Sequence, residues 1–420
     1  MSLIDMFAAA LGAMRPDVVA VHDERCISVR NRNAHCARCA EACTSGCITL
    51  EGNAISVDPE RCIGCGTCAT ACPTSAIEVV DPDDAQLTKL VKASIVATQG
   101  HPVIMCGRAL EGTGVSEAAV VPQAVVLPCL GRIDESLLAG IAAYKAFDAT
   151  LVCGGCEGCE HAPGGALVRR VVAGAQNMVS AYGGATMFSV TEELPEGIAR
   201  AAGGHFGCSD AGSAVSAAVA GGSSRRDFFR QVKSQATQAA SAAVSEELDA
   251  HLGPLPAEPS VPAAYRKVNA AGTLSHHVPT RRTRLYNYLN HIGAGSPVDE
   301  GMRIRSRVIG SVEIDSARCT SCRMCAVFCP TGALEKVDDA SKGLFGVVHR
   351  PAACMQCRLC ERICAAGAIQ VRDEVPVRQF VGKQAVVFPL ARPEWTPNTP
   401  TSMYDKFRQV YGKNVNMSAF

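Results

Sequence analysis

Short aliphatic runs and helical repeats alternate through the middle of the chain. PVIMC (102–106), AVVLPC (124–129) and ATLVC (149–153) are nearly all apolar, as in strands that are buried on both faces. Residues 134–147 and 165–179 instead space their apolar positions like the buried face of a helix. Strands that alternate with helices in this way predict a parallel α/β sheet with helices on both sides.

Shorter strands, separated by turn residues, occur towards both ends. The segments around Ile48–Leu50 and Ala54–Val57, with Gly52 and Asn53 between them, predict a β-hairpin. AIEVV and AIQVR are further short strands, and each follows a run of cysteines. Small α+β modules are therefore expected on either side of the central α/β domain.

The remaining segments are not strand-like. Leu3, Ile4, Phe7 and Leu11 fall on one helical face, which predicts an N-terminal helix. Residues 203–300 are rich in Ala, Ser and Gly and then in Pro, which is typical of a linker that contains helices. We expect a multidomain chain with a helix at 1–24, modules at 25–84, 85–202 and 301–375, a linker at 203–300 and a tail at 376–420.

Composition narrows the range of functions. Lys plus Arg equals Asp plus Glu at 40 each, and only 5% of the residues are aromatic. Nucleic-acid-binding proteins usually have a basic excess and aromatic side chains that stack on bases, so no nucleic-acid partner is expected. No apolar run reaches the roughly 18 residues of a membrane span, and the N-terminus lacks the basic region of an export signal. The sequence predicts a cytoplasmic protein.

Cysteine is unusually abundant, with 23 residues in a chain too long to need disulfide bonds for stability. In a reducing compartment such residues serve as metal ligands or redox groups. Three runs share the spacing C-x2-C-x2-C-x3-C: Cys62, Cys65, Cys68, Cys72; Cys319, Cys322, Cys325, Cys329; and Cys354, Cys357, Cys360, Cys364. A fourth run, Cys36, Cys39, Cys43 and Cys47, has one additional residue between its second and third cysteines. Cys26 and Cys208 stand apart and are expected to be free thiols.

The regular spacing is typical of [4Fe–4S] ligands, because a tight loop places three thiolates on one cubane and a remote cysteine supplies the fourth. Residues 25–82 and 312–373 resemble two-cluster bacterial ferredoxins, which implies crossed ligation between neighbouring runs. The implied sets are Cys36, Cys39, Cys43 with Cys72; Cys62, Cys65, Cys68 with Cys47; Cys319, Cys322, Cys325 with Cys364; and Cys354, Cys357, Cys360 with Cys329. Structural zinc is the alternative, although it usually takes two C-x2-C pairs.

Five further cysteines follow the central strands: Cys106, Cys129, Cys153, Cys156 and Cys159. Ligands of open α/β sheets lie beyond the carboxyl ends of the strands, so these cysteines are expected to converge on one site. Through LPCLGRIDESLL and LVCGGCEGCEHAPGG, residues 100–185 resemble the small iron–sulfur (delta) subunit of methyl-viologen-reducing hydrogenases. The resemblance implies a [2Fe–2S] cluster on Cys106, Cys129, Cys159 and either Cys153 or Cys156. A redox disulfide or metal-free packing is the alternative, and His161 is a further candidate ligand.

Other motifs receive structural interpretations. SSRRDFFRQ at 223–231 resembles an export motif, but its internal position favours an amphipathic helix. HH at 276–277 and RRTR at 281–284 are interpreted as facing solvent or a partner. The tail from Pro389 either wraps a partner or packs on its own domain. The chain has neither a G-x-G-x-x-G unit that opens a helix nor a phosphate-binding loop, so no flavin or nicotinamide site is expected.

The sequence therefore predicts two ferredoxin-like modules around a central parallel α/β domain, with four [4Fe–4S] clusters and one [2Fe–2S] cluster. We expect a non-catalytic electron-transfer subunit of an oxidoreductase complex, of the kind found in anaerobic metabolism. Its partners would be a hydrogenase or formate dehydrogenase and an acceptor such as a heterodisulfide-reductase-like or flavin protein. Two other functions stay open: an iron–sulfur scaffold or maturation protein, and thiol–disulfide chemistry at Cys153, Cys156 and Cys159.

Overall fold

The structure is a computed structural model that describes residues 18–51, 54–111, 115–196, 198, 272–294, 301–381 and 383–393. Residues 1–17 of the expected N-terminal helix, the Gly52 and Asn53 turn, Cys208 and the 223–231 segment lie outside the described residues, as does the tail beyond 393. Within the described residues, no helix is long and apolar enough to cross a membrane.

Four strands form the sheet of the central domain: β5 (Val103–Cys106), β6 (Ala124–Leu127), β7 (Asp148–Val152) and β8 (Met187–Thr191). Their order is β6-β5-β7-β8, and every neighbouring pair is parallel. The predicted parallel sheet is therefore confirmed. Because the strands are parallel, the carboxyl ends of β5, β6 and β7 lie at one edge, close to Cys106, Cys129 and Cys153.

Helices cover this sheet and bury their apolar faces against it. The long ones are α5 (Asp84–Ala97), α7 (Glu135–Ala143) and α8 (Ala162–Ala181). Leu87, Leu138 and Val171 of these helices share one core with Ile104 and Leu151 of the strands. Short turns complete the connections: η3 (Gly107–Leu110), α6 (Glu117–Val120) and η4 (Leu130–Arg132).

The first cysteine-rich module contains two antiparallel strand pairs. β1 (Val19–Val21) pairs with β4 (Ile77–Val79), and β2 (Ile48–Glu51) pairs with β3 (Ala54–Val57). Its helical turns are η1 (Asp23–Arg25), α2 (Ile27–Arg30), η2 (Arg32–Ala34), α3 (Arg38–Glu41) and α4 (Thr67–Ala71). β1 lies inside the range expected to be helical, because its β-branched valines favour a strand once β4 provides a partner.

The second module repeats this plan with longer strands. β10 (Ser311–Ile314) pairs with β13 (Ile369–Arg372), and β11 (Leu334–Asp339) pairs with β12 (Leu344–His349). Its turns are α13 (Met324–Phe328), η5 (Ala340–Lys342), η6 (Pro351–Ala353) and α14 (Leu359–Arg362). β9 (Arg303–Arg305) pairs with β14 (Glu374–Pro376), α15 (Val377–Val381) follows, and β15 (Val386–Pro389) pairs with β12. This part of the tail therefore packs on its own module.

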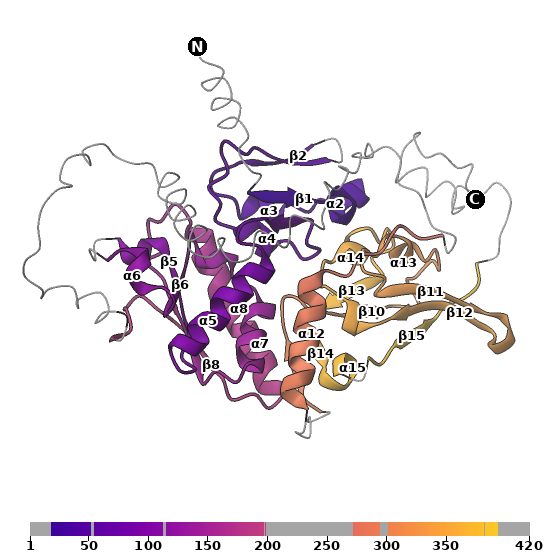
Figure 1. Cartoon of the computed structure of the whole chain (residues 1–420). Coiled ribbons are helices and arrows are strands. Elements are labelled where there is room, and N and C mark those ends of the chain that lie inside the picture. The colour runs from indigo at the N-terminus through magenta and orange to yellow at the C-terminus, as the bar shows by residue number, and fades with distance from the viewer. Residues whose placement is uncertain are drawn as a thin grey trace, which may run out of the picture. The chain divides into compact units, whose positions relative to one another are not determined.

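A long helix lies inside the range that the sequence assigns to the linker. α12 (Thr280–Gly293) packs along α7 (Figure 1). Its residues Leu285 and Leu289 are buried together with Ile304, Val375 and Phe380, which belong to the following module. Residues 272–294 are thus part of the folded structure, because the apolar face of α12 is buried between the central domain and the second module.

Candidate metal centres

The three regular cysteine runs share one backbone conformation. In each run the residue before the second cysteine has a positive φ: 71° at Gly64, 59° at Ser321 and 50° at Gln356. In each run the third cysteine is the second residue of a short helix: Cys68 in α4, Cys325 in α13 and Cys360 in α14. A residue in the left-handed region turns the loop sharply, so the runs present their thiols from equivalent loops.

The cysteines of the second module form two groups. Burial raises the pKa of Cys319, and the nearby thiols of Cys322 and Cys364 raise it further. Burial also raises the pKa of Cys357 to about 12, with Cys329 and Cys354 as charged neighbours. We call the first group the Cys325 site, which comprises Cys319, Cys322, Cys325 and Cys364. The second group is the Cys360 site, which comprises Cys354, Cys357, Cys360 and Cys329.

The first module also has two groups of cysteines. Burial raises the pKa of Cys65, and the nearby thiols of Cys43 and Cys62 raise it further. Burial raises the pKa of Cys39 to about 12, and Cys72, Cys26 and Cys36 are its neighbours. We call Cys62, Cys65 and Cys68 the Cys68 site, and Cys36, Cys39 and Cys72 the Cys39 site. Cys43 and Cys47 both lie beside the Cys68 site, because their sulfurs are 3.4 Å apart and Cys62 is a neighbour of Cys47. The resemblance implies that Cys47 serves the Cys68 site and that Cys43 serves the Cys39 site.

The surroundings of these thiols suit iron–sulfur clusters, which need soft thiolate ligands. Backbone N–H groups point at the last sulfur of each regular run: Ala76 N at Cys72 Sγ (3.3 Å), Leu334 N at Cys329 Sγ (3.4 Å) and Ala368 N at Cys364 Sγ (3.3 Å). Such N–H groups favour the thiolate form that a cluster binds. In the described part of the chain, no group of three or more His, Cys, Asp or Glu side chains is arranged to hold a single metal ion.

The five central cysteines gather at the carboxyl edge of the parallel sheet; we call Cys106, Cys129, Cys153, Cys156 and Cys159 the central site. N–H groups point at three of the sulfurs: Gly154 N at Cys106 (3.2 Å), Gly131 N at Cys129 (3.3 Å) and His161 N at Cys159 (3.4 Å). Burial raises the pKa of Cys156 to about 11, and Cys153, Cys106 and Cys159 raise it further. Cys153 is different, because its thiol donates a hydrogen bond to the carbonyl oxygen of Thr191 at 3.4 Å.

Two glycines at the start of α8 make room for the central sulfurs. A Cβ atom at Gly164 would lie 2.5 Å from Sγ of Cys129, and one at Gly165 would lie 2.3 Å from Sγ of Cys156. Both distances are too short for non-bonded atoms, so the helix reaches these sulfurs only because the residues are glycines. The start of α8 is therefore shaped around Cys129 and Cys156.

The central site adjoins the first module. Burial raises the pKa of Cys129 to about 12, and its charged neighbours are Cys65 and Cys106. A Cβ at Gly131 would lie 2.4 Å from Oγ1 of Thr67, so η4 and α4 meet without space for a side chain. This close approach brings the Cys68 site beside the central site.

The two cysteine-rich modules share an apolar cluster, formed by Ile27, Ala34, Leu274, Met324, Val327, Phe328 and Leu359. Cys36, Cys322 and Cys357 border this cluster, so cysteines from three sites meet around it. Polar contacts surround it: Arg30 donates to the carbonyl oxygen of Phe328 (3.3 Å), and Arg362 donates to that of Ala34 (2.8 Å). The Cys39 site of the first module therefore lies against the second module.

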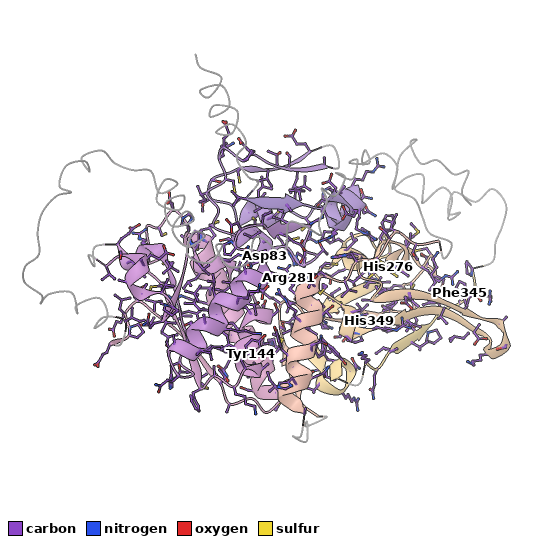
Figure 2. All side chains as sticks on the ribbon, viewed as in Figure 1. Asp83, Tyr144, His276, Arg281, Phe345 and His349 are labelled. Carbon is purple, nitrogen blue, oxygen red and sulfur yellow. The ribbon has the colours of Figure 1, made fainter. Side chains whose placement is uncertain are left out.

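The arginines at 281–284 bind groups of the chain itself, whereas their interpretation from sequence is that they face solvent or a partner. Arg282 is buried, and Arg281 and Arg284 are half-buried. Arg281 donates to the carbonyl oxygens of Ala69 and Cys72 (Figure 2). Arg282 is 2% exposed, and burial lowers its pKa to about 10. Arg284 pairs with Asp84 at an Nη2–Oδ2 distance of 2.5 Å. The short helices of the cysteine modules leave carbonyl oxygens without helical partners, and α12 supplies donors for them.

Comparison with protein families identifies both end modules. Residues 55–78 match the 4Fe-4S binding domain, and residues 310–374 match the 4Fe-4S dicluster domain. The chain therefore carries ferredoxin-type [4Fe–4S] domains on both sides of its central parallel sheet. No solved structure is significantly similar to it.

Curated relatives match shorter segments. Electron transport protein HydN of Escherichia coli is 47% identical over 49 residues, which are 12% of this chain and 28% of that protein. An iron–sulfur protein of the Frd operon of Proteus vulgaris is 34% identical over 97 residues (23% and 60%). One of the iron–sulfur subunits of CoB--CoM heterodisulfide reductase from Methanopyrus kandleri is 45% identical over 56 residues (13% and 8%). This chain spans less than two thirds of the length of each of these relatives.

Proposed function

We propose that the chain is an iron–sulfur electron-transfer subunit that connects a catalytic oxidoreductase to an acceptor protein. One observation carries the proposal: the five cysteine sites adjoin one another in an unbroken series. The proposed content is four [4Fe–4S] clusters in the end modules and one [2Fe–2S] cluster in the central domain. When bound, such clusters change oxidation state by one electron, at potentials set by charge, hydrogen bonds and solvent exposure.

The series begins in the central domain. Cys129 is a close neighbour of Cys65, which joins the central site to the Cys68 site. The two sites of the first module share one core, in which Cys68, Cys39 and Cys72 are all buried. In the proposed series, each redox centre passes electrons directly to the centre in the adjoining site, without a diffusing carrier. The residues that hold the centres therefore determine the route of the electrons through the chain.

The series continues into the second module through the shared apolar cluster. Cys36 of the Cys39 site and Cys357 of the Cys360 site both border that cluster. Within the second module, Cys325 is among the charged neighbours of Cys360, so the last two sites also adjoin. Cys322 of the Cys325 site borders the same cluster. The proposed series therefore runs from the central site through the Cys68 and Cys39 sites to the Cys360 and Cys325 sites, both of which adjoin the Cys39 site.

At the central site we propose Cys106, Cys129, Cys156 and Cys159 as the ligands. Cys153 is left out because its thiol donates to the carbonyl oxygen of Thr191, whereas the start of α8 is shaped around Cys129 and Cys156. The arginines further along α8, Arg169 and Arg170, are both exposed. Arg108 is nearer, because its guanidinium donates a hydrogen bond to the sulfur of Cys159. The central site is thus lined by sulfurs, backbone N–H groups and one cationic side chain.

The proposed partners are a hydrogenase or formate dehydrogenase on one side and a heterodisulfide-reductase-like or flavin protein on the other. Relatives named as an electron transport protein and as iron–sulfur subunits support this assignment. A cytoplasmic location is part of the proposal, because thiols that bind clusters need a reducing compartment.

The test is the iron and acid-labile sulfide content of the anaerobically purified full chain, together with low-temperature EPR of the reduced sample. We expect about 18 irons per chain, from four cubanes and one two-iron cluster. An iron content near eight, or zinc in place of iron, would overturn the five-cluster series. Quantitative transfer of clusters to an acceptor apoprotein would instead support the scaffold function.

Matched variants separate electron transfer from thiol chemistry at the central site. Cys153→Ala is expected to retain the [2Fe–2S] signal, and Cys156→Ala is expected to lose it. If the wild-type chain lacks this signal and instead reduces a disulfide substrate in a manner that requires Cys156, thiol–disulfide chemistry is the better assignment.

A further inference from the structure

We propose that Cys26 is the fourth ligand of the Cys39 site, that Cys43 completes the Cys68 site, and that Cys47 ligates neither cluster. The inference rests on the proposed presence of [4Fe–4S] clusters and goes beyond it by reassigning their ligands. It also makes Cys26 a functional residue although it stands outside every C-x2-C run of the sequence.

The backbone around Cys26 matches that of a first cysteine in a regular run. Cys26 has φ −70° and ψ 123°, and Cys354 has φ −75° and ψ 122°. Each follows a 3-10 turn and donates its N–H to the carbonyl oxygen three residues earlier, Asp23 and Pro351, at 3.0 Å in both cases. The local amino-acid sequence is also the same, because Glu-Arg-Cys occurs at 24–26 and again at 60–62, where Cys62 is the first cysteine of a regular run.

The strand before Cys26 supports the same assignment. β1 precedes Cys26 and pairs antiparallel with β4, the last strand of the first module. β10 precedes Cys319 and pairs antiparallel with β13, the strand that follows the last cysteine of the second module. Cys26 therefore has the same place in the first module as Cys319 has in the second, and Cys319 is the first cysteine of its run.

With Cys26 as its first ligand and Cys36 as its second, the fourth run differs from the regular runs by an insertion between these two cysteines. Nine residues separate Cys26 from Cys36, where two residues separate Cys319 from Cys322. α2 and η2 occupy this insertion. The loop then returns to the shared conformation, because His35 has a φ of 45° immediately before Cys36, as Ser321 has before Cys322.

The end of the fourth run indicates which of Cys43 and Cys47 corresponds to the fourth cysteine of a regular run. Three residues separate Cys39 from Cys43, as they separate the third and fourth cysteines of every regular run. Gly46 has a φ of 62°, and Gly332, which is also three residues past a fourth cysteine, has a φ of 69°. In this register Cys43 is the fourth cysteine, and Cys47 takes the place held by Ala76, Ala333 and Ala368 in the regular runs.

Packing places Cys26 at the Cys39 site. Cys26 is 6% exposed and shares the core of the first module with Cys39 and Cys72. Burial raises its pKa to about 11, N–H groups of Val29 and Ser28 lower it, and Cys72 and Cys36 raise it. An N–H two residues beyond the sulfur also serves Cys319 and Cys354, through Ser321 and Gln356. Cys26 is thus buried beside the cysteines of the Cys39 site, and it has the same backbone N–H contact as the first cysteines of two regular runs.

The insertion provides much of the contact with the second module. Ile27 and Ala34 belong to the apolar cluster shared by the modules. Arg30 donates to the carbonyl oxygens of Ser275 (2.9 Å) and Phe328 (3.3 Å). Because Cys26 lies far before Cys36, the loop between them is long enough to contact the second module. The Cys39 site still has four sulfur ligands.

The test compares Cys26→Ala, Cys43→Ala and Cys47→Ala in the anaerobically purified full chain, by iron and sulfide content and by EPR. Cys26→Ala is expected to lose about one to four irons per chain, with a [3Fe–4S] signal after oxidation when a single iron is lost. Cys43→Ala is expected to do the same at the Cys68 site. Cys47→Ala, the matched control, is expected to keep the wild-type iron content and signals. Wild-type content in Cys26→Ala together with cluster loss in Cys47→Ala would overturn the inference.

Two further readouts remove ambiguity. If Cys26→Ala does not fold, Cys26→Ser is used, because a serine oxygen that binds iron shifts the potential of one cluster; unchanged potentials would count against ligation. A wild-type chain without iron would refute the proposed function itself. An iron-loaded wild type with an iron-loaded Cys26→Ala variant would refute only the ligand assignment.

Discussion

The guanidinium of Arg282 donates a hydrogen bond to the carbonyl oxygen of Cys354, with 3.2 Å between Nη2 and the oxygen. The same side chain also donates to the carbonyl oxygens of Val308, Pro351 and Ala352. A helix packed on the central domain thus holds the loop that begins the Cys360 site. A buried charge is tolerable there because carbonyl oxygens surround it.

Arg282→Met is expected to destabilise the second module by about 3–5 kcal/mol, because it leaves several buried carbonyl oxygens without a donor. Thermal loss of the visible cluster absorption checks this, and the midpoint should fall by several degrees. The exposed Arg378 on α15 provides the control. An Arg282→Met midpoint equal to that of Arg378→Met would contradict the role of Arg282.

Arg30→Met is expected to weaken the contact between the two cysteine-rich modules by about 2–4 kcal/mol. Arg30 is 3% exposed and donates to carbonyl oxygens on both sides of this contact. Urea titration followed by the release of iron checks the loss of stability, and Arg32→Met is the exposed control on the same insertion.

Arg362 contacts the same boundary from the opposite side, through the carbonyl oxygens of Ala34 and His35. Because Arg30 and Arg362 stabilise one interface, the double variant should lose less stability than the sum of the two single variants. Fully additive losses would mean that the two arginines act on separate structures.

Local patterns were sufficient for the loops and strands that carry the regular cysteine runs. The spacing from Cys62 to Cys72 determines a loop and a short helical turn, and the hairpin over residues 48–57 follows from alternation and turn residues. The spacing does not predict the ligand role that we propose for Cys26, because nine residues separate it from Cys36. The sequence nevertheless contains a signal of this role, because Cys26 and Cys62 each end a Glu-Arg-Cys triplet that follows a strand.

The placement of α12 could not be predicted from local pattern. Its sequence TRRTRLYNYLNHIG suggests a polar helix, and the buried state of Arg282 depends on carbonyl oxygens from residues 308–354. Such partners become neighbours only after the second module folds. A polar residue that satisfies distant backbone groups therefore has the same sequence pattern as one that faces solvent.

Gly164→Ala and Gly165→Ala are expected to remove the proposed [2Fe–2S] cluster, because the new Cβ would displace Sγ of Cys129 or Cys156. The iron content should fall by about two per chain, with the other EPR signals retained. Gly174→Ala on the same helix is the control, because its Cβ would lie 3.8 Å from its nearest neighbour. Equal iron contents in all three variants would contradict this account of the central site.

His349→Leu is expected to stabilise the second module at acid pH. His349 is fully buried in β12, neither ring nitrogen has a hydrogen-bond partner within the described structure, and burial lowers its pKa from 6.5 to about 4. Between these values the unfolded chain binds a proton that the folded chain does not, so the free energy of unfolding falls as pH falls.

This pH-dependent loss amounts to about 2 kcal/mol at pH 5 and is nearly absent above pH 7.5. Thermal midpoints between pH 5 and 7.5 check it: the gap between His349→Leu and wild type should widen towards pH 5. The exposed His291 of α12, replaced in the same way, is the control variant. A constant gap across this range would show that His349 has the same pKa in the folded and unfolded chain, and would contradict this account.

The two lengths of chain that the structure describes, within residues 18–198 and 272–393, contact each other through α12, Arg281 and the insertion after Cys26. None of these contacts uses a residue between the two lengths. We therefore expect that a gene split between the codons for residues 198 and 272 would still give an associated particle, now as a heterodimer of two polypeptides. Either polypeptide made alone would expose its half of the shared apolar cluster, so the cell would have to produce the two in equal amounts.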